Sequence, residues 1–175
     1  MSELLLAAEI ILLLAGLLVM LVLIFSMLSF AYGAPLVTSG RDVGRAALRL
    51  ARLKPGEKFY DLGSGDGRVV FIAASLGADA VGIEINPVLW LWSSLVAFFS
   101  GSRARFVRGN FFSTSLRGAD VVFLYTWQGT NEKIEGKLRK ELGKGARVVS
   151  HRFKFVKWKP AESDAERRLL MYVKR

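Results

Sequence analysis

The stretch from Phe59 to Ile85 reads FYDLGSGDGRVVFIAASLGADAVGIEI. It begins with an apolar, β-type run that ends in an acidic residue, Asp61, and continues through a glycine-rich turn, GSGDG. A helix-like run follows the turn, and a second β-type run carries Glu84 near its end. A strand, a glycine turn, a helix and a second strand in this order are typical of a βαβ unit that binds a nucleoside. The stretch therefore predicts an α/β fold with a parallel sheet.

The spacing of the glycines distinguishes two classes of nucleoside ligand. Dinucleotide-binding folds use G-x-G-x-x-G, which turns backbone amides toward a pyrophosphate. Here the third glycine, Gly67, comes one residue early, and Arg68 stands in its place. A carboxylate at Asp61 would repel a pyrophosphate, but it suits a ligand with an ammonium and a sulfonium group. Glu84, at a strand end, can accept both hydroxyls of a ribose. We therefore expect S-adenosylmethionine as the cofactor; the alternative is an ordinary turn whose glycines serve positive φ angles.

The segment from Ile10 to Phe30 contains no charged residue and consists mostly of Leu, Ile, Val and Phe. A helix needs roughly 20 apolar residues to cross a bilayer. A cleaved signal peptide is the alternative, but it normally has a basic region ahead of a shorter apolar run, and no Lys or Arg precedes this one. We expect a transmembrane anchor over residues 4–30, a linker over 31–40 and one domain over 41–175.

Basic residues follow the apolar segment, and none precedes it. The positive-inside rule then predicts a single-pass membrane protein with its domain on the cytoplasmic side. The whole chain carries +10, and the only charges before Arg41 are Glu3 and Glu9, so the remainder carries +12. A basic domain favours anionic lipid, nucleic acid or another acidic partner. The sequence shows no RNA-binding module with an aromatic signature. RNA is therefore the weaker expectation, and no DNA partner is expected.

Strands and helices alternate through the domain. Apolar runs predict strands over 58–62, 79–85, 105–107, 119–125, 147–155 and 169–174. Helical patterns lie over 41–53, 68–76, 88–99 and 131–142. Such alternation predicts a mostly parallel, Rossmann-like sheet. The tail after His151 has no convincing crossover helix, so the last strands are expected to pair antiparallel.

The segment VRGNFF, residues 107–112, directly follows the third predicted strand. It is therefore expected at the carboxyl edge of the sheet, where folds of this class bind ligands. The amide of Asn110 can read an adenine edge, and Phe111 or Phe112 can lie against the ring. The alternative is an Asn-containing turn flanked by core aromatics. In the context of Asp61 and Glu84 we favour the adenine contact.

The segment VFLYTWQGTN, residues 122–131, follows the fourth predicted strand and is expected to face the transferred group. Tyr125 and Trp127 offer aromatic faces, which attract a sulfonium or an ammonium. Asn131 offers a hydrogen bond there or, alternatively, caps the next helix. The single histidine, His151, is more often structural than catalytic in such a position. With no Cys and no second His in the chain, no metal site is expected.

From about residue 36 onward, the chain resembles the archaeal protein-lysine methyltransferases and their membrane-anchored mitochondrial relatives. These belong to the seven-strand (class I), S-adenosylmethionine-dependent superfamily. The matching segments are YDLGSGDGR at 60–68, GIEIN at 82–86, GNFF at 109–112, KLRKELGKGARVVSHRF at 137–153 and WKP at 158–160. The resemblance implies a seven-strand sheet, S-adenosylmethionine as the methyl donor and a protein lysine as the acceptor.

The resemblance also carries functional residues onto this chain. The family has a Pro-Thr segment ahead of the domain, and here Thr38 stands in the match while proline occurs only at Pro35. The stretch from Tyr125 to Gln128 is more aromatic than in the archaeal enzymes. The expected cofactor-binding residues are Thr38, Asp61, Gly63, Ser64, Gly65, Asp66, Glu84, Asn110 and Phe111. The expected catalytic residues are Tyr125, Trp127 and Asn131.

The expected reaction is direct displacement, in which the acceptor amine attacks the methyl carbon while the protein supplies alignment and desolvation. No dedicated base is evident from the sequence. An aromatic pocket around Tyr125 and Trp127 favours the neutral amine by desolvation. Because an anchor limits reach, the expected substrate is a lysine on a membrane-associated protein. Two other classes stay open: a methyltransferase for RNA or a small molecule, and a non-catalytic, membrane-tethered cofactor-binding protein.

Overall fold

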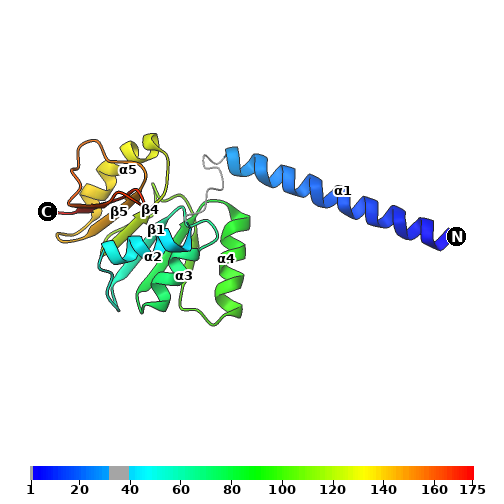
Figure 1. Cartoon of the computed structure of the whole chain (residues 1–175), viewed down its shortest axis with the longest axis horizontal. Coiled ribbons are helices and arrows are strands. Elements are labelled where there is room, and N and C mark those ends of the chain that lie inside the picture. The colour runs from blue at the N-terminus through cyan, green and yellow to red at the C-terminus, as the bar shows by residue number, and fades with distance from the viewer. Residues whose placement is uncertain (1, 32–39) are drawn as a thin grey trace. The chain divides into compact units, whose positions relative to one another are not determined.

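The computed structural model describes residues 2–31 and 40–175, and the side chains of residues 5–21 and 40–175. An N-terminal helix, α1 (Ser2–Ala31), and the domain that follows it are separate compact units (Figure 1). Among the residues described, no helix is both long enough and apolar enough to cross a membrane. The predicted anchor extends beyond the side chains that are described, and most of the predicted linker lies outside the described residues.

The domain is built on a seven-stranded sheet in the order β3-β2-β1-β4-β5-β7-β6. The strands are β1 (Lys58–Leu62), β2 (Asp79–Glu84), β3 (Arg105–Arg108), β4 (Val121–Leu124), β5 (Arg147–His151), β6 (Glu162–Asp164) and β7 (Leu169–Val173). The first five strands along the chain, β1 to β5, pair in parallel, whereas β7 pairs antiparallel with both β5 and β6. The predicted α/β class with antiparallel last strands is therefore confirmed.

Within residues 40–175, four helices accompany the sheet: α2 (Arg41–Leu50), α3 (Arg68–Ser75), α4 (Pro87–Phe99) and α5 (Gln128–Glu141). Helices α2 and α3 pack on one face of the sheet, and α5 packs on the other (Figure 1). Helix α4 lies against β2 and β3. The connection from β3 to β4, residues 109–120, contains no helix.

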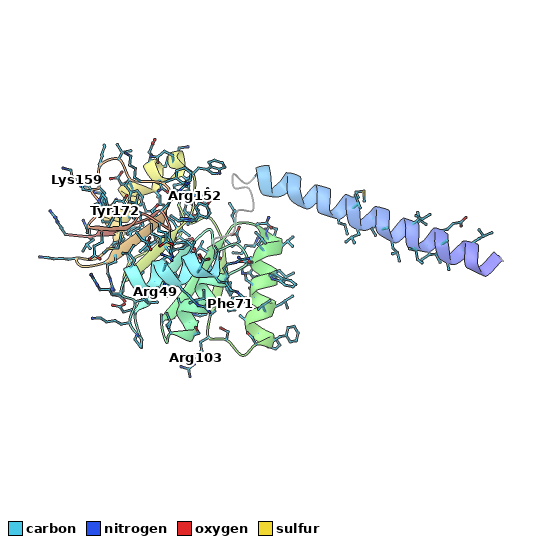
Figure 2. The ribbon with its side chains drawn as sticks, in the orientation of Figure 1. Arg49, Phe71, Arg103, Arg152, Lys159 and Tyr172 are labelled. Atoms are coloured by element: carbon cyan, nitrogen blue, oxygen red, sulfur yellow. The ribbon has the colours of Figure 1, made fainter. Side chains whose placement is uncertain are left out.

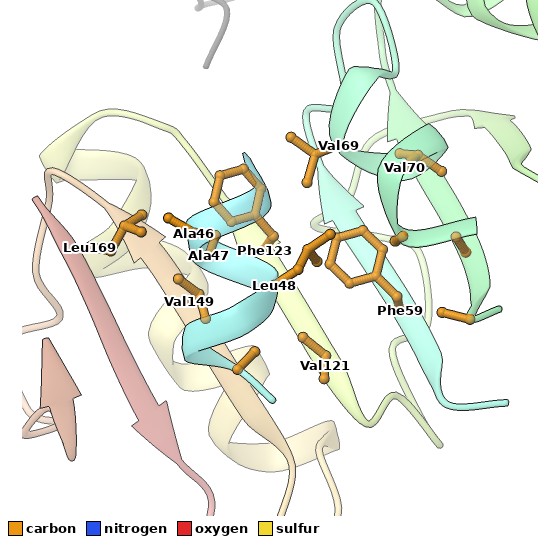
Figure 3. Packing of buried hydrophobic residues seen from close by; sticks show 14 of the residues in the cluster. Ala46, Ala47, Leu48, Phe59, Val69, Val70, Val121, Phe123, Val149 and Leu169 are labelled. Carbon is orange, nitrogen blue, oxygen red and sulfur yellow. The ribbon is translucent and has the colours of Figure 1, made fainter. Parts of the chain in front are cut away.

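The face covered by α2 and α3 has a tightly packed apolar core. Ala47 and Leu48 of α2 lie against the sheet, where Phe59 of β1, Phe123 of β4 and Val149 of β5 meet them (Figure 3). These side chains are at most 2% exposed. Fully burying a large apolar side chain stabilises a fold by about 1.5–3 kcal/mol. This core holds the strands in register and so fixes where their carboxyl ends lie.

Three features differ from the sequence prediction. The short strand β6 is not anticipated, because its three residues are polar and pair only at the edge of the sheet, with β7. The strand predicted over 147–155 ends at His151, where Arg152 adopts a positive φ of 69° and turns the chain. Helix α5 begins at Gln128, with Trp127 at the N-cap position and no side-chain cap. The alternative in which Asn131 caps this helix is therefore wrong.

Candidate functional site

The carboxyl ends of the central strands bring the candidate residues to one edge of the sheet. Asp61 of β1 is in register with Gly82 of β2 and Phe123 of β4. Leu124 of β4 is in turn in register with Ser150 of β5. The strand order reverses between β1 and β4, and α/β sheets bind ligands at such a switch point. The turns after β1, β2, β4 and β5 therefore surround one candidate site.

Asp61 is a buried carboxylate, only 3% exposed. Burial raises the pKa of Asp61 well above its usual range, and the negative charges of Glu84 and Asp66 raise it further. Within residues 40–175, no donor forms a hydrogen bond with this carboxylate. A buried ionised group without a partner is energetically costly. A cationic ligand at this position would remove that cost and favour the ionised form.

Glu84 is also buried but is engaged by the backbone. Its Oε2 accepts a hydrogen bond from the N–H of Gly65 at 2.8 Å, and its Oε1 accepts one from the N–H of Asn86 at 2.8 Å. The side chain therefore ties the glycine turn after β1 to the start of α4. Because each carboxylate oxygen can accept a second hydrogen bond, Glu84 can hold the turn and still bind hydroxyl groups.

The glycine turn is open on one side and closely packed on the other. Gly63 and Gly65 have φ angles of 81° and 57°, and a Cβ at either would meet no atom within 4 Å. A Cβ at Gly67 would instead lie 2.5 Å from the ring of Phe106. In the described structure the buried hydroxyl of Ser64 has no hydrogen-bond partner. The open side of the turn thus leaves space for a ligand, whereas the Ser64 side chain lies against Gly82 of β2.

The residue that replaces the last glycine of the dinucleotide pattern helps to fix the turn. The guanidinium group of Arg68 donates hydrogen bonds to both oxygens of Asp66. The backbone N–H of Arg68 also donates to Asp66, at 3.3 Å. Asp66 therefore closes the start of α3, and its charge acts on the nearby carboxylate of Asp61.

The segment after β3 forms a turn closed by Asn110. The Oδ1 of Asn110 accepts a hydrogen bond from the N–H of Phe112 at 2.9 Å. The N–H of Gly109 donates to the carbonyl of Glu84 at 2.9 Å, which places the turn beside the end of β2. Phe111 is half-buried and packs against the core on the α5 side of the sheet. The Asn-containing turn considered as an alternative is present, and the adenine contact stays a prediction.

The turn after β4 carries an aromatic wall. The ring of Tyr125 lies 4.2 Å from that of His151, measured between centroids. The guanidinium carbon of Arg152, labelled in Figure 2, lies 5.6 Å from the centre of the Tyr125 ring. Trp127 is 51% exposed, and its ring lies 6.2 Å from that of Phe153. Tyr125 therefore already contacts a cation of the chain, whereas Trp127 presents a ring to the surface.

His151 is a neutral group in this wall. Burial lowers the pKa of His151 from 6.5 to about 4, and the charges of Arg152 and Arg168 contribute to the same shift. Its Nδ1 is buried and has no hydrogen-bond partner in the part of the chain described. At neutral pH the imidazole is therefore uncharged, because it is too weak a base to take up a second proton.

Asn131 is fully buried and joins three segments of the site. Its Oδ1 accepts a hydrogen bond from the hydroxyl of Thr126 at 2.6 Å. Its Nδ2 donates to the Oγ of Ser150 at 2.9 Å and to the carbonyl of Phe153 at 2.8 Å. The side chain thus fixes the turn after β4 against β5 and against the turn that follows it. This geometry gives Asn131 a positioning role.

The structure separates the candidate residues into two groups along the edge. The acidic half comprises Asp61, Glu84 and the glycine turn, and the aromatic half comprises Tyr125, Trp127 and His151 with its neighbours. Thr38 lies outside the described residues. Sequence reasoning missed Ser150, Arg152 and Phe153, which only the tertiary pairing of β4 with β5 brings into the site. Among the residues described, no cluster of His, Cys, Asp or Glu could hold a metal ion.

Comparison with protein families and with named relatives gives consistent matches. A family model described as the ANTKMT methyltransferase domain matches residues 61–162. A protein-lysine N-methyltransferase of Saccharolobus islandicus is 36% identical over 139 residues, which cover 77% of this chain and 86% of the relative. The adenine nucleotide translocase lysine N-methyltransferase of Mus musculus is 40% identical over 116 residues, which cover 65% of this chain. The match spans only 50% of the length of this mouse relative.

A solved structure also matches most of the chain. It is described as an RNA methyltransferase from Salinibacter ruber in complex with S-adenosyl-L-homocysteine. The similarity has a TM-score of 0.73 at 36% sequence identity, and it covers 79% of this chain and 92% of the other. S-adenosyl-L-homocysteine is the product that remains when S-adenosylmethionine has given up its methyl group.

Proposed function

The chain belongs to the ANTKMT methyltransferase domain family and is an S-adenosylmethionine-dependent methyltransferase, and we propose that its acceptor is a lysine side chain of a protein. The family and the cofactor predicted from the sequence are both confirmed. The lysine acceptor is supported by the names of the relatives from Saccharolobus islandicus and mouse. The observation that carries the site assignment is the buried Asp61 carboxylate, which has no donor of its own within residues 40–175 and lies beside an open glycine turn.

The acidic half fits the cofactor in charge and in shape. Asp61 would pair with the ammonium of the amino-acid part, because this buried carboxylate lacks a counter-charge. Glu84 would accept ribose hydroxyls through the lone pairs that Gly65 and Asn86 leave free. The open side of Gly63 and Gly65 leaves room for a ligand close to the backbone. S-adenosylmethionine, when bound, supplies an electrophilic methyl group that an amine can displace.

The aromatic half suits an amine that must lose its charge before it reacts. Desolvation lowers the pKa of a buried amine, and nearby positive charges lower it further. Both effects act on His151, because burial and the charges of Arg152 and Arg168 lower its pKa to about 4. A lysine amine entering beside Tyr125 and Trp127 would meet the same environment and favour its neutral form. Because the pKa of His151 is about 4, its imidazole is a weak base, and deprotonation is left to water.

Alignment in this half depends on fixed segments rather than on a catalytic base. Asn131 holds Thr126, Ser150 and the carbonyl of Phe153 together through three hydrogen bonds. These bonds fix the turn on which Tyr125 and Trp127 stand. Holding two reactants in a reactive geometry can lower a barrier by several kcal/mol. Asn131 would therefore act on rate through alignment without touching the acceptor.

Membrane attachment through the N-terminal helix is a separate element of the proposal. Its support is the uncharged run from Ile10 to Phe30 and the basic residues that follow it. By the positive-inside rule, the domain faces the cytoplasm and its acceptors lie near the membrane surface. Carbonate washing should leave the full chain in membranes, and protease added outside sealed, right-side-out vesicles should leave the domain intact. Release by carbonate, or digestion from outside, would overturn this element alone.

RNA is the second candidate acceptor, because the similar structure from Salinibacter ruber is described as an RNA methyltransferase. The basic domain, which carries +12, is compatible with that acceptor. Protein is favoured because the names of both relatives, from Saccharolobus islandicus and mouse, concern lysine methylation. The two acceptors are separated by the chemical nature of the labelled product.

The deciding experiment is transfer of a labelled methyl group from S-adenosylmethionine to a membrane extract by the purified full chain. We expect label that protease removes and ribonuclease does not. The Asp61→Asn variant serves as a control, because its cofactor affinity should fall while its fold remains. Label that ribonuclease alone removes would establish RNA as the acceptor. Label confined to small molecules would overturn both macromolecular assignments.

A further inference from the structure

Helix α4 presents large apolar side chains to the outside, unlike an ordinary surface helix. The residues that it buries, Ser93 and Ala97, are small, and the partly buried Trp90 donates from its indole to the carbonyl of Phe106 in β3. The hydroxyl of Ser93 is satisfied within the helix by the carbonyls of Leu89 and Trp90. The outward side, termed here the α4 face, consists of Val88, Leu91, Trp92, Leu95, Phe98 and Phe99.

The α4 face is a continuous and strongly exposed apolar surface. Phe98 is 77% exposed, Phe99 is 80% exposed and Trp92 is 60% exposed. The residues of the face recur at spacings of three and four, so they form one stripe along the helix. Side chains of α4 project on the side away from Phe71, which is labelled in Figure 2. Contiguous apolar patches of this kind mark interaction sites rather than ordinary protein surface.

The α4 face also continues into a hollow of the domain. Ala97 and Phe98 line a cavity of about 790 Å³ together with Tyr60, Ile83 and Val107 of the neighbouring strands. The hollow is also lined by polar side chains, among them Ser94, Arg105 and Thr114. The α4 face is therefore an apolar ridge bordered by a partly polar recess.

Charge identifies the kind of partner. The segment from Ile85 to Ala104 contains no carboxylate, and Arg103 follows the helix (Figure 2). Arg103 and Arg108 are exposed, and neither forms an ion pair with a carboxylate of residues 40–175. A second copy of the chain would meet this face with the same charge and no acid on its helix. Anionic lipid headgroups, in contrast, supply negative charge directly above an apolar layer.

We propose that the α4 face docks the domain onto a bilayer with anionic headgroups, independently of any N-terminal anchor. Helices that lie in the membrane interface bury their apolar side about 5–10 Å deep and are held at the rim by basic side chains. Trp92 and Phe99 would lie in the interface, where aromatic rings are favoured. Arg103 and Arg108 would bind phosphate groups of the lipids. This surface concerns where the domain sits and does not depend on which acceptor it methylates.

The chain contains no cysteine, so single labels can be placed cleanly in the full-length protein. Trp92→Cys and Phe99→Cys would carry a nitroxide on the α4 face, and Lys140→Cys, exposed on α5, would carry the matched control. Each protein is reconstituted into vesicles of phosphatidylcholine and phosphatidylglycerol. Electron paramagnetic resonance then compares collisions with oxygen, which concentrates in the bilayer, and with a water-soluble nickel complex.

Docking predicts that positions 92 and 99 become more accessible to oxygen than to nickel, with the reverse order at position 140. Exchanging Arg103 and Arg108 for Gln should reduce this difference in anionic vesicles. Unchanged circular dichroism and cofactor affinity of the labelled proteins serve as the folding control.

Equal nickel accessibility at all three positions would overturn the proposal. Spin–spin coupling between copies would assign the α4 face to a dimer. Shielding of positions 92 and 99 from both reagents, in vesicles and in detergent alike, would show that another segment of the chain covers the α4 face. Spin–spin coupling and such shielding would each refute docking.

Discussion

The two halves of the carboxyl edge have opposite electrostatic character. The acidic half holds Asp61 and Glu84 within one buried turn, and the charge of Glu84 raises the pKa of Asp61. The aromatic half holds Tyr125, Trp127 and a neutral His151 whose pKa lies at about 4. A cationic cofactor is stabilised by the first environment, and a neutral amine by the second. One edge of the sheet can therefore bind a cationic cofactor in one half and favour the neutral form of an amine in the other.

The two halves also differ in how their polar groups are satisfied. Within residues 40–175, Asp61 has no hydrogen-bond donor, and the hydroxyl of Ser64 is unpaired. In the aromatic half, Asn131 is fully bonded within the fold, and among the described residues only the Nδ1 of His151 is buried without a partner there. Unpaired buried groups are typical of a site that a ligand completes. Substitutions in the first half should therefore act on binding, and substitutions in the second on alignment.

The largest expected effect is that of Glu84→Ala. The change leaves the N–H groups of Gly65 and Asn86 without their acceptor, and each such loss costs about 1–3 kcal/mol. We expect the free energy of unfolding to fall by about 3 kcal/mol and cofactor affinity to fall with it. Glu84→Gln, which keeps one acceptor oxygen, should lose less of both. Denaturant unfolding and calorimetry measure the two effects; unchanged stability would show that Glu84 does not hold the turn.

Acid should destabilise the aromatic half through His151. The pKa of His151 is about 4 in the fold against 6.5 in the unfolded chain, so protonation favours unfolding. Stability is then full above pH 6.5 and falls by about 3 kcal/mol as the pH drops toward 4. Asp61 changes stability with pH in the opposite direction. Its pKa is raised in the fold, so the stability that it contributes is lost as the pH rises. Unfolding measured against pH in Asp61→Asn removes the contribution of Asp61, and adding His151→Phe should reduce the remaining slope between pH 6.5 and 4. A slope that His151→Phe leaves unchanged would contradict the assignment.

Asp61→Asn should separate binding from stability in the acidic half. Removing the charge should weaken S-adenosylmethionine binding by about 1.5–3 kcal/mol, the usual range for hydrogen bonds to a charged group. The free energy of unfolding should not fall, because a buried charge next to Glu84 disappears. Asp79→Asn, at the start of β2 and in an ion pair with Arg105, serves as the control. Equal affinities in all three proteins would refute the role of Asp61.

Asn131→Ala should affect alignment more than cofactor binding. It removes the bonds that fix Thr126, Ser150 and the carbonyl of Phe153, at a cost of about 1–3 kcal/mol in stability. We expect slower methyl transfer in single-turnover experiments with an unchanged dissociation constant for the cofactor. Ser150→Ala, which removes one partner only, should have a smaller effect in the same direction. A changed cofactor affinity with unchanged transfer would reverse the assignment of the two halves.

Trp127→Ala should leave the fold almost untouched, because the side chain is 51% exposed. Stability should change by less than about 0.5 kcal/mol, as for most surface substitutions. Methyl transfer should slow if the exposed ring lines the acceptor channel, with cofactor affinity unchanged. Leu76→Ala, an apolar residue at the end of α3 with similar exposure, provides the control. Identical transfer rates in both variants would remove Trp127 from the site.

The residues of the acidic half could be predicted from the sequence because they lie close together along the chain. The glycine turn, Asp61 and Glu84 lie within one βαβ unit, where spacing along the chain determines spacing in the fold. The helix predicted over 88–99 is also confirmed; it begins at Pro87, and the side chain of Asn86 accepts a hydrogen bond from the N–H of Val88. What the sequence did not reveal is that Glu84 uses both oxygens to hold the backbone, since those bonds depend on how β2 approaches the turn.

The aromatic half was only partly readable because its contacts are long-range. Asn131 was noted as polar, but its partners Ser150 and Phe153 lie about twenty residues away and meet it only when β4 pairs with β5. The positive φ of Arg152 has no sequence signal, since glycine is the residue that such angles normally attract. The outward position of the α4 face follows from how the helix packs against β2 and β3. Its sequence, apolar nearly all round, gives no indication of which side is outward.

The most direct test of the account is the chemical position of the transferred methyl group. The full chain is incubated with S-adenosylmethionine that carries a deuterated methyl group, together with membrane proteins and RNA from one extract. Tandem mass spectrometry then locates the heavy methyl in peptides and in nucleosides. The account predicts the heavy methyl on the Nζ of lysine, and much less of it with Asp61→Asn. Heavy methyl on nucleosides, with none on lysine, would contradict it.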